Sequence, residues 1–106
     1  MGTMAELKVR KLTQNQAKVI QAMVSVPYAN FVVPGTYIST ASGLQGNALG
    51  GTVSALERNG IIQPFGRDGR QFNWELIDPD LRQAHREDSK TFLHMLTTIA
   101  GGTISV

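Results

Sequence analysis

The chain of 106 residues contains no cysteine, and its apolar residues never form a long uninterrupted run. The absence of cysteine excludes disulfide frameworks, thiolate metal sites and cysteine nucleophiles. The apolar runs are far shorter than the roughly 18 residues that a membrane-spanning helix needs, and no secretory leader is recognisable. We therefore expect a cytoplasmic protein with no membrane partner. With 42% hydrophobic residues, the chain can build one core but is too short for two ordinary domains.

The motifs of common catalytic and nucleotide-binding sites are also missing. His85 and His94 are the only two histidines, and at nine residues apart they do not share a helix face at metal-ligand spacing. The glycine-rich segment 43–46 lacks the Gly-Lys-Ser/Thr of a phosphate-binding loop, and the Gly-x-Ser-x-Gly of a nucleophile elbow is absent. We predict no enzyme, no metal site and no cofactor, and we expect both histidines at the surface.

Charge is low, and the basic surplus lies in the first three quarters of the chain. The formal net charge is +2. Residues 1–76 hold seven Lys or Arg against four acids, which gives +3, and residues 77–106 hold three against four, which gives −1. This asymmetry permits a phosphate-binding surface in the first part without requiring one.

The first predicted helix begins at a capping box, in which Thr13 and Gln16 satisfy each other's backbone amides. It runs to about Ser25, because Pro27 cannot continue it. After a short extended segment or ordered loop, a second helix is expected over Tyr37–Ser42. Thr36 would cap this helix, Ile38 and Ala41 would face the core, and Gly43 would stop it.

A third helix is predicted from Gly46 or Asn47 to Gly60, with one apolar face. Leu49, Val53 and Leu56 recur at i, i+4 and i+7, so they share one side. The opposite side carries small or hydrogen-bonding residues: Asn47, Gly50, Gly51, Ser54 and Arg58.

A β-hairpin is predicted after this helix. Ile61–Phe65 is a strand, and Gly66–Arg70 has the composition of a turn. The second strand, Gln71–Leu76, alternates strictly, so that Phe72, Trp74 and Leu76 share one face and Trp74 is expected in the core.

This order of three helices and a hairpin, from Leu12 to Leu76, resembles the winged helix-turn-helix superfamily, particularly small MarR-like or ArsR-like regulators. The resemblance rests on residues 36–44 as positioning helix and turn, and on residues 47–59 as recognition helix. Leu56-Glu57-Arg58-Asn59-Gly60-Ile61-Ile62 looks like the Leu-x-x-x-Gly-Leu/Ile-Ile sequence that closes such helices. Gly66–Arg70 would be the tip of the wing.

The predicted fold is therefore α+β and mostly helical: a winged helix-turn-helix with a β-hairpin wing and an additional C-terminal helix. The winged domain would occupy residues 12–77. Residues 1–11 form a basic segment that is mobile, contacts DNA or is simply solvated. Residues 78–100 form the C-terminal helix or helices, and residues 101–106 form a tail.

The C-terminal segment begins with Asp78 as cap and Pro79 at the first helical position. Charge at residues 86–90 interrupts its apolar stripe, so the segment is either one long helix or two helices that join near Asp88-Ser89. Because such regulators commonly dimerise through a helix outside the core, the resemblance implies a homodimer. Alternatively, the helix covers its own core. The candidate interface residues are Phe92, Leu93, Leu96 and Ile99.

The resemblance implies a small dimeric transcriptional regulator that binds double-stranded DNA, with the third helix in the major groove and the wing on the backbone. The expected contact residues are Gln45, Asn47, Gly50, Gly51, Ser54, Arg58, Arg67 and Arg70.

Each of these residues also has a structural interpretation. Gln45 and Asn47 suit capping or turns, and Arg67 and Arg70 suit a solvated turn. Gly50-Gly51 is unusual inside a helix, which indicates close approach of a partner or tight packing. Because Arg58 is the only basic residue on the helix, an alternative function is a winged-helix protein-interaction module that does not contact DNA.

Overall fold

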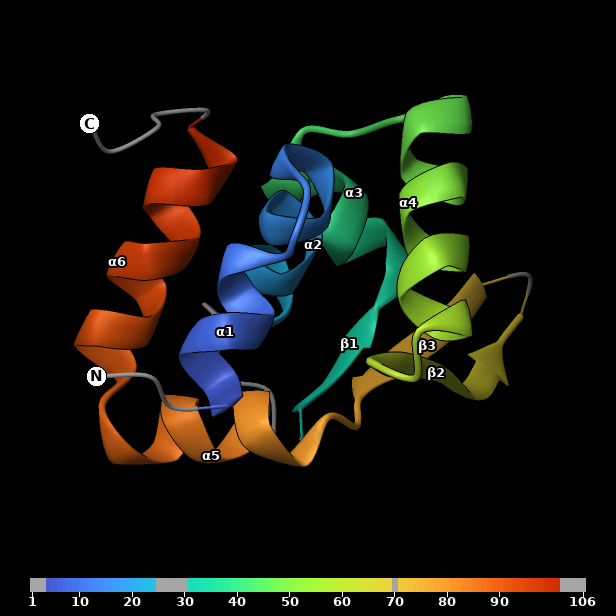
Figure 1. Ribbon diagram of the computed structural model, residues 1–106. Helices are drawn as coiled ribbons and strands as arrows, with labels where there is room; N and C mark the ends of the chain where they lie inside the picture. The colour runs from blue at the N-terminus through green and yellow to red at the C-terminus, as the bar shows by residue number, and fades with distance from the viewer. Residues whose placement is uncertain (1–3, 25–30, 70, 102–106) are drawn as a thin grey trace.

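The computed structural model describes residues 4–24, 31–69 and 71–101, and these form an α+β, mostly helical fold (Figure 1). The helices are α1 (Met4–Arg10), α2 (Gln14–Val24), α3 (Gly35–Ser42), α4 (Gly46–Arg58), α5 (Pro79–Glu87) and α6 (Ser89–Ala100). The strands are β1 (Val32–Pro34), β2 (Ile62–Asp68) and β3 (Gln71–Leu76). The predicted fold class is confirmed at this level.

The centre of the molecule is α2, which packs against α3, α4 and α6. In Figure 1, α4 and the hairpin lie on one side of it, and α6 lies on the other. The predicted capping box begins α2: the Gln16 amide donates to the Thr13 hydroxyl at 3.1 Å, and the Thr13 amide donates to the Gln16 side chain at 3.0 Å. The helix buries residues on several faces, as its central place requires; these are Ala17, Val19, Ile20, Ala22, Met23 and Val24.

Helix α3 begins two residues before the predicted start. Pro34 is its N-cap and no side chain caps it, so Thr36 is not the cap. Ile38 is buried as expected, but Ala41 is exposed, because only the Ile38 side of this short helix faces the core. Gly43 ends α3 in the left-handed conformation, with φ of 75°, as predicted.

The hairpin belongs to a three-stranded antiparallel sheet in the order β1-β3-β2. The short extended segment before α3 is β1, which pairs with β3 from Val32 opposite Glu75. Ile62 and Leu76 pair across β2 and β3, and both are buried. The predicted turn was too long, since β2 continues to Asp68 through an irregularity in register between Pro64 and Arg67.

Two helices follow the sheet, which is the two-helix alternative for this segment. The Asp78 carboxylate caps α5 by accepting from the amides of Asp80 and Leu81 at 3.0 and 3.1 Å. Asp88 ends α5 and caps α6, whose first turn binds its carboxylate through Thr91.

Helix α6 covers the chain's own core. Phe92 and Leu96 are 2% and 0% exposed, and α6 packs on α2. The expectation that these two residues form a dimer surface is therefore corrected for the described chain: they are buried internally. Leu93 and Ile99 are only partly buried and pack at the edge of the core.

The N-terminal segment is also ordered. Residues 4–10 form α1, whose Val9 is 1% exposed and which contacts α5 and α6. The interpretation of this segment as a mobile arm is therefore corrected for these residues.

Candidate nucleic-acid interface

The outer face of α4 is open, as the sequence predicts. Its inner face buries Val53 and Leu56, and Leu49 packs partly against the core. Thr52 is also buried, and its hydroxyl donates to the Ala48 carbonyl at 2.6 Å. All six candidate contact residues on or beside this helix are exposed: Gln45, Asn47, Gly50, Gly51, Ser54 and Arg58.

The polar side chains of this face are not used within the fold. Gln45 is the N-cap residue of α4, but its side chain makes no capping hydrogen bond. Among the described residues, the side chains of Asn47, Ser54 and Arg58 have no hydrogen-bond or ion-pair partner. Gln45 thus occupies the capping position without a side-chain cap, and the donors and acceptors of this face are available to a partner.

The adjacent glycines of α4 have no role in packing. A Cβ atom added to Gly50 or to Gly51 would meet nothing within 4 Å. The alternative that one of them packs tightly against another helix is therefore wrong. Each glycine costs about 1 kcal/mol relative to alanine in a helix interior, and the fold itself does not compensate this cost.

The described outer part of the β2–β3 hairpin, residues 65–69 and 71–72, is here called the wing. Arg67 is exposed, and its guanidinium carbon lies 5.1 Å from the centre of the Phe72 ring, which it faces across the strand pair. Arg70, the other predicted cation of the tip, lies outside the described residues.

The wing also exposes two aromatic rings, Phe65 at 51% and Phe72 at 45%. The alternating pattern correctly placed Leu76 in the core, but Trp74 is only half-buried and Phe72 is exposed. Exposure rises along this face of β3 from Leu76 through Trp74 to Phe72, so the core covers only its Leu76 end. The sequence signal for these exposed rings is the pair of phenylalanines on either side of the predicted turn.

A close contact joins the start of α3 to β3 at Phe72 and Trp74. A Cβ atom at Gly35 would lie 3.1 Å from the Phe72 carbonyl oxygen and 3.8 Å from the Trp74 ring nitrogen. Glycine at this position therefore lets the start of α3 approach β3 closely.

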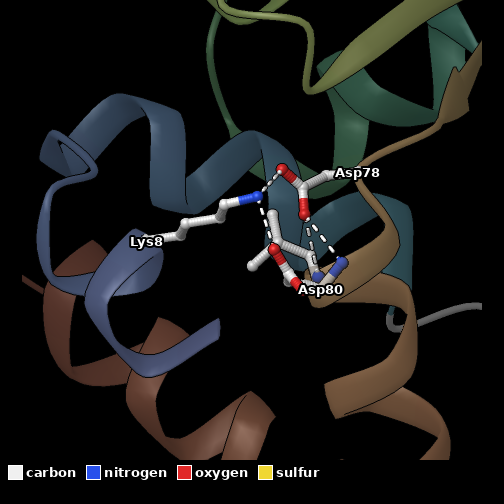
Figure 2. A network of polar contacts seen from close by, with 4 residues as sticks. Lys8, Asp78 and Asp80 are labelled. Carbon is white, nitrogen blue, oxygen red and sulfur yellow. Dashed lines mark hydrogen bonds and ion pairs between the residues drawn. The ribbon is translucent and has the colours of Figure 1, made fainter. Parts of the chain in front are cut away.

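The basic residues before α2 are engaged elsewhere. Lys8 Nζ lies 2.8 Å from Asp78 Oδ2 and 2.7 Å from Asp80 Oδ2 (Figure 2). The hydrogen bond to Asp78, followed by that to Asp80, raises the pKa of Lys8 above its usual value. Arg10 pairs with Glu6 one turn earlier. Lys8 and Arg10 thus serve the fold on the α1–α5 side, and only exposed Lys11 retains the predicted freedom.

A cationic and aromatic cluster on α5 was also missed. The guanidinium carbons of Arg82 and Arg86 lie 4.9 and 5.8 Å from the centre of the Phe31 ring. His85 contacts Phe31 edge-on, at 5.5 Å between ring centres. His85 is therefore half-buried, which corrects its placement at the surface, whereas His94 is exposed. No local sequence signal could join residues 31 and 85.

Comparisons with known proteins provide no assignment: no family model, curated protein or solved structure matches the chain. Within residues 4–24, 31–69 and 71–101, no three acidic or histidine side chains are grouped to hold a metal ion. No helix in the described part of the chain is long and apolar enough to span a membrane.

Proposed function

We propose that this chain is a winged-helix protein that binds double-stranded DNA, with α4 in the major groove and the wing on the flanking backbone. The order of α2, β1, α3, α4 and hairpin supports the proposal. Helix α4 is anchored by one apolar face, and the exposed wing lies on the same side of the molecule (Figure 1). This is how a helix-turn-helix presents a helix to DNA.

The observation that carries the proposal is the pair of exposed glycines on α4. A fold gains nothing from Gly50 and Gly51 where nothing touches them, and alanine would form the helix better. Residues that break a local rule without structural compensation are expected at functional sites. Without side chains here, the helix backbone can come close to a groove wall or phosphate.

The charge of this surface predicts modest affinity with a shallow salt dependence. Arg58 and Arg67 are exposed on it, and the sequence adds Arg70 at the tip. Few phosphate contacts release few counterions, so the slope of log K against log salt should be small for a DNA-binding protein. Exposed Gln45, Asn47 and Ser54 would then supply contacts to base edges.

The test is a salt titration of binding to a 20-base-pair duplex, followed by fluorescence anisotropy. We expect affinity to fall as salt rises, and the slope to decrease by about 1 for each phosphate-contacting arginine that is removed. Arg58→Ala and Arg67→Ala should show this decrease. Lys90→Ala, at an exposed cation of α6, is the matched control and should leave the slope unchanged. Absence of duplex binding at low salt would contradict the proposal.

A protein-interaction module is the second candidate, favoured by the nearly uncharged face of Gly50, Gly51 and Ser54. Arg58 alone offers positive charge on α4. The same titration separates the two functions, since a protein-binding face gives no salt-dependent affinity for DNA. Because one fold supports both functions, only the binding properties of the exposed surface can distinguish them.

Transcriptional regulation as a homodimer is a further part of the proposal that depends on the resemblance. A two-fold contact through α6 would have to use Leu93 and Ile99, since Phe92 and Leu96 are buried in the same chain. Duplex binding by a single copy does not require it.

A further inference from the structure

Helix α5 carries two arginines whose guanidinium groups share one aromatic ring. The guanidinium carbons of Arg82 and Arg86 lie 4.9 and 5.8 Å from the centre of the Phe31 ring, which is within the range of a cation–π contact. The two arginines are one turn apart and lie on the same side of α5. The shared ring therefore restricts both side chains and brings two positive charges to one place on the surface.

The backbone of Phe31 is strained. Its φ is 60°, in the left-handed region, which a bulky side chain adopts only at an energetic cost. In the part of the chain that the structure describes, it is the only residue other than glycine with a positive φ. Outliers of this kind persist where the surrounding structure holds them, and they gather at functional sites. The strained residue is thus the one that positions Arg82 and Arg86.

The two arginines border a hollow at the surface, here called the α5 hollow. Its volume is about 410 Å³, which is within the range of sites for small molecules. Polar donors and apolar side chains line it together: Arg82, Gln83, Arg86, Ile77 and Pro79. None of the described residues that line it is acidic. The α5 hollow therefore suits a ligand that has both a negative charge and an apolar part.

The positive charge of the α5 hollow is only partly neutralised by the fold. Glu75 Oε2 lies 4.0 Å from Arg82 Nη1, at the limit of an ion pair. Arg86 is exposed and has no hydrogen-bond or ion-pair partner among the described residues. The Gln83 amide donates to Glu87 at 2.8 Å and keeps a second N–H for another acceptor. Because like charges one turn apart destabilise a helix, a bound anion would relieve this repulsion.

Guanidinium groups bind phosphate through paired hydrogen bonds, and two of them match the double charge of a phosphate monoester. We propose that the α5 hollow binds a small organic phosphate, with Arg82 and Arg86 on the phosphate oxygens and the organic part on Ile77 and Pro79. The concave shape favours a small molecule over a DNA backbone. In Figure 1, α5 also crosses the bottom of the molecule, whereas α4 begins at the top. This inference does not depend on the proposed function.

The experiment is a titration of the isotope-labelled protein with phenyl phosphate at constant ionic strength, followed by NMR. We expect saturable shifts at the Nε–H groups of Arg82 and Arg86. Inorganic phosphate should bind about tenfold more weakly, because it lacks the ring, which would cover about 55 Å² of apolar surface. Benzyl alcohol has the ring without the charge and should cause no saturable shift at these two residues.

Variants test whether the arginines hold the phosphate. Arg82→Gln and Arg86→Gln should each weaken the binding of phenyl phosphate by at least about tenfold, because each removes a charged hydrogen bond. Arg86→Lys keeps the charge but loses the paired donors, so it should weaken binding less than Arg86→Gln. Lys90→Gln, at an exposed cation of α6, is the matched control and should bind like the wild type. Thermal unfolding shows that each variant is folded.

Several results would overturn the inference. Phenyl phosphate that causes no saturable shift at Arg82 or Arg86 excludes the site. Equal binding of benzyl alcohol would show that the α5 hollow does not recognise an anion, and an equal loss in Lys90→Gln and Arg86→Gln would reduce binding to net charge. If phenyl phosphate does not bind but Arg82→Gln/Arg86→Gln lowers the slope of log K against log salt for the duplex, the arginines contact DNA instead. That last result would support the proposed function while it overturns this inference.

Discussion

Polar side chains pair with one another on one side of the molecule, whereas on the other side exposed polar groups have no partner among the described residues. On the α1–α5 side, Lys8 pairs with Asp78 and Asp80, and Asp78 also caps α5 (Figure 2). On the α4–wing side, the exposed polar groups of α4 have no partner among the described residues. The first arrangement stabilises the fold. The second leaves hydrogen-bonding capacity available for another molecule.

The glycines that flank α4 differ from those inside it in what they do for the stability of the fold. Gly43 and Gly60 adopt φ of 75° and 71°, where other residues are strained, so these glycines serve the fold. Gly50 and Gly51 lie inside a regular helix with open space around them. Glycine therefore lies where the backbone requires it at Gly43 and Gly60. At Gly50 and Gly51 it lies where alanine would form the helix better, on the surface where we place the DNA.

The largest effect that separates the two sides is expected from Asp78→Ala. This change removes the cap of α5 and leaves Lys8 with one carboxylate fewer. Loss of a cap together with a charged hydrogen bond should lower the free energy of unfolding by about 2 kcal/mol. The melting temperature should then fall by roughly 10 °C for a domain of this size.

Asp78→Asn is the matched control for this change, because asparagine also caps helices well. Asp78→Asn should lose only the stabilisation that depends on the negative charge beside Lys8. Neither variant should alter the slope of log K against log salt for DNA binding. An Asp78→Ala protein as stable as the wild type would show that the α1–α5 network does not hold the fold.

A smaller effect of opposite sign is expected on the other side. Gly50→Ala and Gly51→Ala should each raise the free energy of unfolding by about 0.4–1 kcal/mol, because the methyl group meets nothing and the unfolded chain loses freedom. Affinity for duplex DNA should fall in the same variants, since the methyl groups occupy the space of the approaching backbone. Chemical denaturation and anisotropy measure the two quantities.

Gly60→Ala is the control, since its φ of 71° makes alanine unfavourable and the variant should be destabilised. If the Gly50→Ala/Gly51→Ala protein is more stable and binds DNA unchanged, close approach at this face is refuted.

The smallest expected effect is on how the free energy of unfolding falls at low pH, and it comes from the α5–α6 junction. Hydrogen bonds from the Thr91 hydroxyl and amide lower the pKa of Asp88 below its usual value. A carboxyl whose pKa is lower in the folded state contributes stability above its unfolded pKa and loses it as pH falls through the folded pKa. Asp88→Asn should therefore flatten the loss of stability as pH falls below 3.8, the ordinary pKa of an aspartate. If urea denaturation gives the same fall in the free energy of unfolding at low pH for the wild type and Asp88→Asn, the Thr91 hydrogen bonds do not make Asp88 a source of this pH dependence.

Local chemistry allowed much of the fold to be predicted. The capping box at Thr13, the left-handed stop at Gly43 and the Asp78-Pro79 start are determined by groups within a few residues of one another. Such signals do not depend on distant parts of the chain. The apolar face of Val53 and Leu56 was found in the same way, because helix periodicity alone places these residues together.

Predictions failed where distant segments decide burial. Phe72 follows the same alternation as Leu76, yet Phe72 is exposed and Leu76 is buried, because the core covers only the Leu76 end of this face of β3. The pairing of Lys8 with Asp78 joins residues 70 positions apart, and no local pattern indicates it. The candidate site was predicted as a set of positions on α4, but the aromatic surface of the wing was not.

From residue 12 onward, the sequence by itself determined where the helices and the hairpin strands begin and end to within a few residues, because capping, turn and periodicity energies act over short separations. Only the tertiary structure decided which of these faces remain uncovered. Coverage depends on the lengths of packed elements and on contacts between segments far apart in the chain. The open glycines of α4 belong to this second kind of information, and the proposed function depends on them.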